Sequence, residues 1–150
     1  MKMVIQRVSS AEVRVDSQVV GQIGIGLAVL VGLERGDGDP NLERAARRLA
    51  TLRVFSDDEG RMNRGLDEVG GAVLAVSQFT LAGSIRKGRR PSFIESAPAE
   101  QAAQDVEHGV RTPIARGTVV DPALRSEQHH GDDFVAYVVM VAPRDDLPAR

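Results

Sequence analysis

The chain has 150 residues, a length typical of one domain that buries about 70% of the surface exposed by its unfolded form. Of these residues 42% are hydrophobic and 27% are charged, the formal net charge is -2, and cysteine is absent. This composition excludes disulfides, thiolate zinc sites and cysteine nucleophiles, and the net charge restricts any RNA binding to a local basic patch.

The N-terminal third is predicted to be mostly β-sheet. Residues 4–8 and 13–15 alternate between apolar and polar side chains, which indicates a half-buried pair of strands turning at residues 9–11. The unbroken apolar run at residues 27–31 is typical of a central strand covered on both faces. Residues 1–7 become polar too early for a secretory signal, and no apolar run approaches about 18 residues, so we expect a cytoplasmic protein without a membrane span.

One clear helix is predicted over residues 41–53, with Asp39 as a capping carboxylate before Pro40. A strand follows at residues 72–80, then a short helix at residues 98–107 and strands at 117–120 and 134–141. These elements predict an α/β fold, a layered, barrel-like single domain over residues 1–150 with few helices.

The strand at residues 72–80 ends in hydroxyl and amide side chains. In a regular strand Ser77 and Phe79 face one way and Gln78 and Thr80 the other, so Ser77 and Thr80 share a pocket only if pairing stops there. Where pairing stops, the main-chain N–H groups of Phe79 and Thr80 become free donors, which a tetrahedral oxyanion requires. The alternative is that Ser77 and Thr80 only satisfy backbone groups at a strand end.

A basic loop follows this strand. It carries four cations in five positions, Arg86, Lys87, Arg89 and Arg90. Gly88 permits close backbone approach, and Phe93 offers a stacking face, a combination suited to phosphates and exposed bases at the end of a single strand. The alternative is a solvated surface loop, the more common role of a short basic run.

Other candidate motifs are weaker. The glycines at 21, 24 and 26 precede a strand and open no helix, which argues against dinucleotide binding. His129 and His130 with Asp132 and Asp133 lack a separated third ligand, so a solvated loop is favoured over a metal site. A Ser-His-Asp triad with one of the histidines is not excluded by sequence order, but no nucleophile elbow is present. An ester hydrolase of this kind would use water or a substrate hydroxyl against a carbonyl polarised by backbone donors.

The two most distinctive segments are Ser77-Gln78-Phe79-Thr80-Leu81 and Arg86-Lys87-Gly88-Arg89-Arg90-Pro91-Ser92-Phe93. Together with residues 1–8, 20–32, 52–55 and 60–63, in the same order and spacing, they resemble the D-aminoacyl-tRNA deacylase family over roughly residues 1–93. This resemblance implies a homodimeric α/β enzyme that hydrolyses the ester joining a D-amino acid, or glycine, to the terminal adenosine of tRNA, without a metal or organic cofactor.

The resemblance also implies roles for particular residues. Ser77, Gln78, Phe79 and Thr80 would line the catalytic pocket, either with Thr80 as a side-chain nucleophile or with main-chain atoms and the ribose 2′-hydroxyl doing the chemistry. The expected substrate-binding residues are Arg7, Met62, Asn63, Arg86, Lys87, Arg89, Arg90 and Phe93. The expected partners are the 3′ end of aminoacyl-tRNA and a second copy of the chain, but neither DNA nor a membrane.

The sequence departs from the family near its C-terminus. Family members carry a Gly-Pro-Val-Thr segment whose Gly–cis-Pro carbonyls enter the partner's pocket and exclude L-amino acids, whereas this sequence contains no Gly-Pro. Divergence, loss of activity or a shifted reading frame after about Pro98 would each produce this difference. Two rival hypotheses follow: a catalytically silent protein that binds the tRNA end through the basic loop, and a dimeric scaffold with no RNA role.

Overall fold

The computed structural model describes residues 1–15, 17–86, 88–98, 101–102, 104–106, 117–120 and 136–141. Its strands are β1 (Lys2–Val8), β2 (Ser10–Val15), β3 (Gln18–Ile23), β4 (Gly26–Gly32), β5 (Phe55–Ser56), β6 (Met62–Arg64), β7 (Ala72–Ser77), β8 (Gly117–Val120) and β9 (Ala136–Val141). The helix α1 spans Asp39–Ala50, and a 3₁₀ turn, η1, spans Phe79–Ala82. Residues 101–102 and 104–106 are also helical, within the short helix that the sequence predicts.

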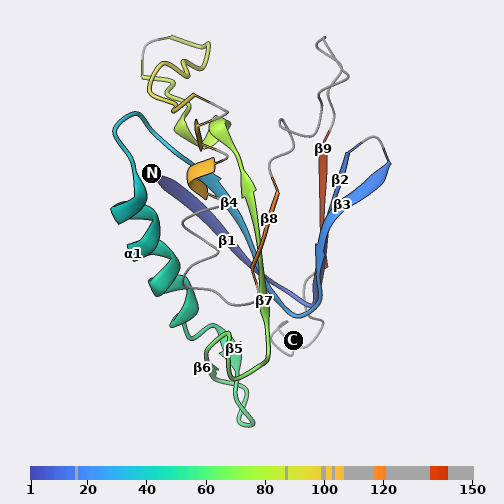
Figure 1. Cartoon of the computed structure of the whole chain (residues 1–150). Coiled ribbons are helices and arrows are strands. Elements are labelled where there is room, and N and C mark those ends of the chain that lie inside the picture. The colour runs from blue at the N-terminus through green and yellow to red at the C-terminus, as the bar shows by residue number, and fades with distance from the viewer. Residues whose placement is uncertain are drawn as a thin grey trace.

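The strands form two main sheets (Figure 1). The first has the order β1-β4-β7-β8, with β1 antiparallel to β4 and with β4, β7 and β8 parallel to one another. The second has the order β3-β2-β9 and is antiparallel, and β5 and β6 form a separate hairpin. Because β4 and β7 are parallel, their carboxyl ends meet at one edge of the first sheet, where β7 delivers the polar residues.

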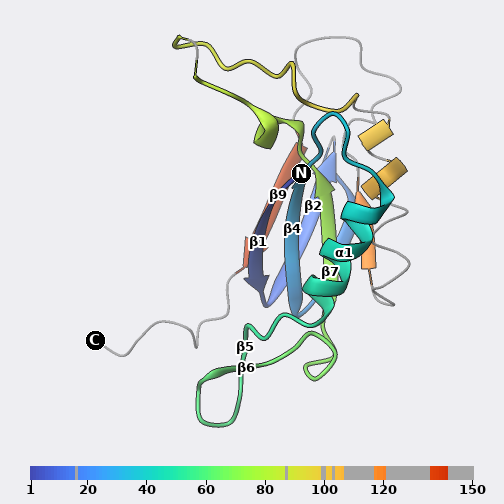
Figure 2. The ribbon, with the colours of Figure 1, turned by 90° about the vertical axis from the view of Figure 1, so that its left-hand side faces the viewer.

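Buried side chains lie on both faces of the first sheet. On the face toward α1, the cluster includes Leu27, Val29 and Val31 of β4, Val73 and Ala75 of β7, and Leu42, Ala46 and Leu49 of α1. On the face toward the second sheet, a separate cluster consists of Ala28, Leu74 and Val76 with Val8, Ala11 and Val13. Figure 2 shows α1 lying along the first sheet. The prediction of a central strand covered on both faces is therefore confirmed, as is the layered α/β fold with few helices.

This double burial fixes β7 almost to its last residue. Val73, Leu74, Ala75 and Val76 are all at most 1% exposed. Each fully buried aliphatic side chain of valine or leucine size contributes about 1.5–3 kcal/mol of transfer free energy. The polar residues that begin at Ser77 thus lie at the end of a strand whose position is fixed by packing on both faces.

The predicted pairing of the first two strands is wrong. β1 pairs with β4, whereas β2 pairs with β3 and β9, so the chain crosses from one sheet to the other at Ser9 instead of forming a hairpin. The physical reason lies in the corner itself. Val8, Ala11 and Val13 all join the cluster between the two sheets, and a flat hairpin would leave one of its faces without this cover.

The predicted helix is confirmed with shifted ends. Its N-cap is Gly38, one residue before the expected Asp39, and Pro40 lies in the first turn as expected. At the other end the helix stops at Ala50, three residues before the predicted limit. The hydroxyl of Thr51 donates to the carbonyl oxygens of Arg47 and Arg48 at 3.1 and 3.3 Å, which satisfies acceptors left open by the last turn.

Candidate active site

The polar end of β7 leaves the sheet earlier than the sequence predicts. The main-chain N–H of Gln78 still donates to the carbonyl of Val31 at 2.7 Å, but from Phe79 the backbone turns into η1. The expectation that the strand continues to Thr80 is therefore wrong. Strand pairing ends before Phe79, as required by the hypothesis that the N–H groups of Phe79 and Thr80 are free donors.

The turn leaves two consecutive main-chain donors without an acceptor. Leu81 donates to the carbonyl of Gln78 at 3.2 Å and Gly83 donates to that of Thr80 at 3.1 Å. Within the part of the chain that the structure describes, no group accepts from the N–H of Phe79 or Thr80. The first N–H groups of a helical turn have no acceptor inside that turn, so this is the result expected of its geometry.

Two polar side chains meet at this turn. The amide Nε2 of Gln78 donates to the hydroxyl oxygen of Thr80. Thr80 is exposed, and Ser77 is half-buried at the end of β7. An exposed hydroxyl, an amide and two free N–H groups thus occupy one strand tip.

Two glycines allow η1 to pack this closely. A Cβ on Gly32, at the end of β4, would lie 2.6 Å from the Cβ of Leu81 and 3.0 Å from the carbonyl oxygen of Gln78. A Cβ on Gly83 would lie 2.8 Å from the ring of Phe93 and 3.0 Å from the carbonyl oxygen of Thr80. Real Cβ atoms do not approach other atoms that closely, so both positions require glycine. Neither glycine was among the predicted site residues, although Gly32 ends the segment 20–32 that resembles the family and Gly83 follows the segment 77–81.

A second segment packs over the tip. The ring of Phe93 meets that of Phe79 edge to face, with ring centroids 5.3 Å apart and planes at 70°. The hydroxyl of Ser96 donates to the carbonyl oxygen of Phe79 at 3.3 Å. Phe93 was expected near the substrate, whereas nothing in the sequence pattern singled out Ser96.

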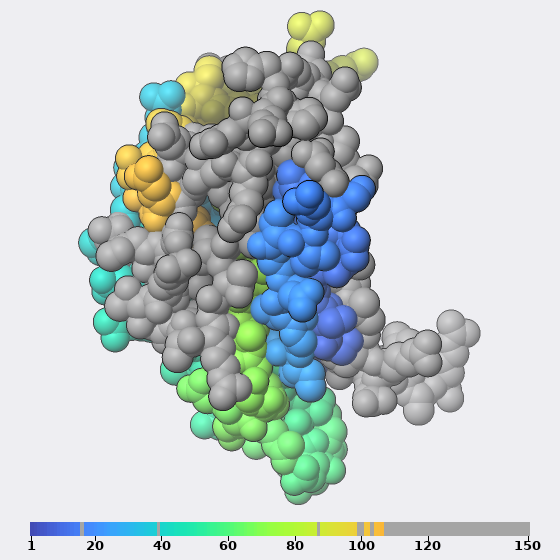
Figure 3. Space-filling model, turned by 45° about the vertical axis from the view of Figure 1, so that its right-hand side comes forward, coloured from blue at the N-terminus to red at the C-terminus, as the bar shows by residue number. Residues whose placement is uncertain are grey.

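The loop between η1 and Phe93 projects from the body of the protein (Figures 2 and 3). Ser84 and Ser92 exchange two main-chain hydrogen bonds of 2.9 Å, which closes the loop into a hairpin, and Gly88 turns it with φ of +91°. The guanidinium groups of Arg86, Arg89 and Arg90 are exposed and have no ion-pair partner among the described residues. Lys87 lies outside the described residues.

Three expected substrate-binding residues lie at the opposite end of the sheet. Arg7 pairs with Leu27, four residues along β4 from the partner of Ser77, which corresponds to about 13 Å. The Arg7 guanidinium donates to the carbonyl of Val54. Met62 and Asn63 lie in β6, at the bottom of Figure 1, where Asn63 accepts a hydrogen bond from Arg53 at 3.4 Å. One chain therefore does not bring Arg7, Met62 and Asn63 to the tip of β7.

The carboxylate of Glu34, which follows β4, is ion-paired with Lys2 and with the Met1 ammonium. Hydrogen bonds from Lys2 and from the Met1 ammonium lower the pKa of the Glu34 carboxyl, which lies 2.9 Å from the Lys2 amine. The backbone of Glu34 forms an isolated bridge with that of Ser96, so this ion-paired residue anchors the segment that covers the tip.

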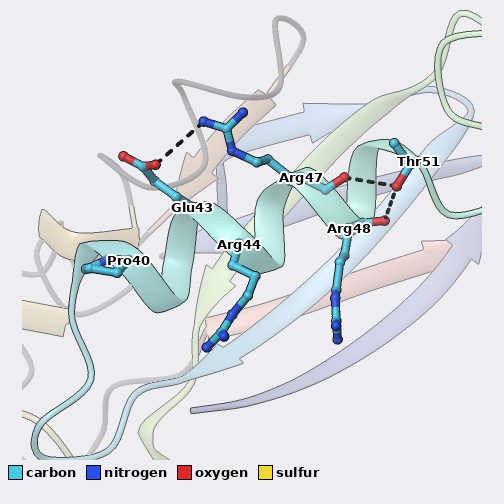
Figure 4. A pocket seen from close by; sticks show the side chains of 6 residues that line it. All are labelled: Pro40, Glu43, Arg44, Arg47, Arg48 and Thr51. Carbon is cyan, nitrogen blue, oxygen red and sulfur yellow. Dashed lines mark hydrogen bonds and ion pairs between the residues drawn. The ribbon is translucent and has the colours of Figure 1, made fainter.

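A shallow hollow of about 490 Å³ lies along the solvent face of α1 (Figure 4). Arg44 and Arg48 project from the helix on the same side, while Arg47 turns toward Glu43 at 3.7 Å. None of these residues was a predicted site residue, and no residue of β7 lines the hollow.

The described residues include no group of three His, Cys, Asp or Glu side chains able to hold a metal ion. His129 and His130 lie outside that part of the chain. No helix in the described part of the chain is long and apolar enough to cross a membrane.

The fold and the tip define an α/β protein with consecutive main-chain donors beside a cationic loop, an arrangement that can stabilise an oxyanion on an anionic substrate. The chain belongs to the D-Tyr-tRNA(Tyr) deacylase family, whose model matches residues 4–121.

Individual relatives agree with this assignment. The D-aminoacyl-tRNA deacylase of Pelobacter propionicus is 50% identical over 117 residues, covering 78% of this chain and 81% of the relative. The D-aminoacyl-tRNA deacylase of Xanthomonas campestris pv. campestris is 57% identical over 102 residues, covering 68% and 70% of the two chains.

Two solved structures share the fold. A c-Myc DNA unwinding element binding protein superposes with a TM-score of 0.75 at 29% identity, covering 94% of this chain and 91% of the other. A probable eukaryotic D-amino acid tRNA deacylase superposes with a TM-score of 0.58 at 23% identity, covering 74% and 66%.

Proposed function

We propose that this protein hydrolyses the ester bond of D-aminoacyl-tRNA, releasing the free D-amino acid and tRNA. The observation that carries the proposal is the tip of β7, where the N–H groups of Phe79 and Thr80 have no acceptor among the described residues, in a chain that the family model matches over residues 4–121. The domain comprises residues 1–150, works in the cytoplasm, and includes Ser77, Gln78, Phe79 and Thr80 in its catalytic pocket.

The proposed reaction needs little from the side chains. Water, positioned by the ribose 2′-hydroxyl of the substrate, adds to the ester carbon and forms a tetrahedral intermediate. The main-chain donors of Phe79 and Thr80 stabilise its oxyanion. The proton that the attacking water gives up passes through the ribose 2′-hydroxyl to the 3′ oxygen, whose bond to the former ester carbon then breaks and releases the free amino acid and the 3′-hydroxyl of the tRNA. Gln78 holds the Thr80 hydroxyl beside these donors.

The basic loop supplies the affinity for RNA in this proposal. Arg86, Arg89 and Arg90 are exposed cations in the described part of the loop, and Phe93 lies between the loop and the tip. Phosphates of the single-stranded 3′ end would contact the arginines while a terminal base stacks on an aromatic ring. In the homodimer that we propose, Arg7, Met62 and Asn63 of a second copy of the chain complete the same substrate site.

The experiment that tests this function compares D-tyrosyl-tRNA with L-tyrosyl-tRNA as substrates of the purified protein. We expect release of D-tyrosine, with the ratio of the two rates measuring chiral selectivity in a chain that lacks Gly-Pro. Failure to release either amino acid, combined with salt-sensitive tRNA binding, would instead support the catalytically silent rival. Failure of both activity and binding would support the scaffold.

Replacement of Thr80 by alanine is expected to change the single-turnover rate by less than about fivefold. The substitution removes the hydroxyl but leaves the main-chain N–H groups of Phe79 and Thr80, to which the proposal assigns the oxyanion. The rate constant of hydrolysis of D-tyrosyl-tRNA at saturating enzyme is the measurement. A loss of 1,000-fold or more would identify the hydroxyl as the nucleophile and remove the main-chain mechanism.

We propose that the working form is a homodimer. Apolar side chains crowd the tip and its loop, since Phe79, Ile85 and Ile94 are 51%, 72% and 72% exposed in one chain. An antiparallel pair of chains related by a two-fold axis would cover them and bring the end that holds Arg7 of each copy to the tip of the other. We expect a mass near twice 16.1 kDa by light scattering and dissociation by Ile94→Asp. A wild-type monomer at micromolar concentration would contradict the dimer.

A further inference from the structure

Ser96 holds one side of the peptide group that joins Phe79 to Thr80. Its hydroxyl lies 3.3 Å from the carbonyl oxygen of Phe79 and donates to it. The carbonyl of Phe79 and the N–H of Thr80 belong to the same planar, trans peptide, so they point in opposite directions. Holding the carbonyl on the Ser96 side therefore directs the N–H of Thr80 away from Ser96, where no described residue accepts it.

The segment that carries Ser96 is itself fixed on the β4 side of the fold. Arg35 donates to the carbonyl of Glu95 at 2.8 Å, and Ala97 donates to that of Leu33 at 3.0 Å. A further main-chain bond of 3.0 Å joins Ser96 to Phe93, whose ring contacts Phe79. Ser96 is half-buried in this arrangement. The hydroxyl thus reaches the tip from a segment that two hydrogen bonds to residues after β4 locate independently of η1.

A hydrogen bond to a carbonyl also strengthens the N–H of the same peptide as a donor, because chains of hydrogen bonds polarise one another. The separation of 3.3 Å exceeds the usual length of about 2.7–2.8 Å for a bond between oxygens, so the contact is a modest one. Its effect on catalysis should therefore be smaller than the loss of about 100-fold that accompanies removal of a main-chain oxyanion donor.

We propose that Ser96 is a positioning residue for the deacylation reaction, which aims the Thr80 N–H at the substrate by holding the Phe79 carbonyl. This role rests on the proposed function, because it assigns that N–H to the oxyanion. Ser96 does not touch the reacting atoms. It acts through one peptide group, which distinguishes it from the residues that line the pocket.

The test compares Ser96→Ala, Ser96→Thr and the control Ser10→Ala, whose exposed side chain lies at the start of β2 and makes no hydrogen bond in the described structure. Ser96→Ala is expected to lower kcat on D-tyrosyl-tRNA about fivefold with KM within twofold. Ser96→Thr keeps the hydroxyl and should recover at least half of the rate, and Ser10→Ala should match wild type. In ¹⁵N-labelled protein, the Thr80 amide resonance should shift in Ser96→Ala and return toward its wild-type position in Ser96→Thr.

The proposal would be overturned by a wild-type kcat in Ser96→Ala or by an unshifted Thr80 amide in that variant. An equal loss of kcat in Ser96→Ala and Ser96→Thr would do the same, because the hydroxyl would then not be the group that matters. If the wild-type protein hydrolyses no aminoacyl-tRNA, the proposed function fails on that measurement alone. The Thr80 resonance then still decides whether Ser96 orients this peptide.

Discussion

Replacement of Gly32 by alanine is expected to slow hydrolysis of D-aminoacyl-tRNA on the order of 100-fold while the protein remains folded. The added Cβ would lie 2.6 Å from the Cβ of Leu81 and 3.0 Å from the carbonyl oxygen of Gln78, so η1 has to move. Removing a main-chain oxyanion donor typically costs about 100- to 1,000-fold in kcat, and moving η1 misplaces two. Single-turnover rates and the temperature of thermal unfolding are the two measurements.

Gly24 offers a matched control for this change, because a Cβ there meets nothing within 4 Å. Gly24→Ala should retain both the wild-type rate and the wild-type unfolding temperature. Overpacking at Gly32 costs about 1–3 kcal/mol, which a domain with about 5–15 kcal/mol of stability tolerates. An alanine at Gly32 that turns over at the wild-type rate would show that the position of η1 does not govern catalysis.

The sequence was informative where one pattern had one physical explanation. The apolar run at residues 27–31 can be buried on both sides only in a central strand, and β4 is that strand. The polar residues after Val76 mark the end of a buried strand, and Arg86, Arg89 and Arg90 mark an exposed loop, as observed. Both segments could therefore be located from residue type alone.

Contacts between distant segments were not predictable in the same way. The corner at Ser9 looks like a hairpin turn in sequence, and only the shared cluster of Val8, Ala11 and Val13 shows why the chain changes sheet. The contact of Ser96 with Phe79 joins residues 17 apart through a loop whose path no periodicity encodes. The departure of η1 from the strand depends on Gly32, which lies 47 positions before the tip in the chain and acts only through packing.

The separation of the expected site residues is the most consequential of these results. Arg7, Met62 and Asn63 belong to segments that resemble the family as clearly as the tip does. In one chain, however, Arg7 lies about 13 Å from the tip along β4, and Met62 and Asn63 lie in the separate hairpin of β5 and β6. A match to sequence motifs does not say how far apart the matched residues lie in the folded chain. In the proposed homodimer a second copy would bring these residues to Thr80, and the mass measurement tests whether that dimer forms.

Reversal of the three described arginines of the basic loop, Arg86→Glu with Arg89→Glu and Arg90→Glu, is expected to weaken tRNA binding on the order of 100-fold. Each phosphate contact with a single strand contributes about -0.7 to the slope of log K against log salt, so removing three should reduce the magnitude of that slope by about 2. Fluorescence anisotropy with labelled tRNA at several salt concentrations measures both quantities. Single-stranded DNA of the same terminal sequence, added as a competitor, tests whether the loop distinguishes RNA.

The matched control reverses Arg44, Arg47 and Arg48, which changes the net charge equally but lies on α1, on the other side of the molecule from the loop in Figure 2. Because the formal net charge of the whole chain is only -2, a general electrostatic effect would weaken binding equally in both variants. Loss in the loop variant alone would place the phosphate contacts beside the tip of β7. Equal loss of affinity in both variants would contradict a tRNA site at the basic loop. Wild-type affinity in both variants would support the scaffold hypothesis, which gives the basic loop no role in RNA binding.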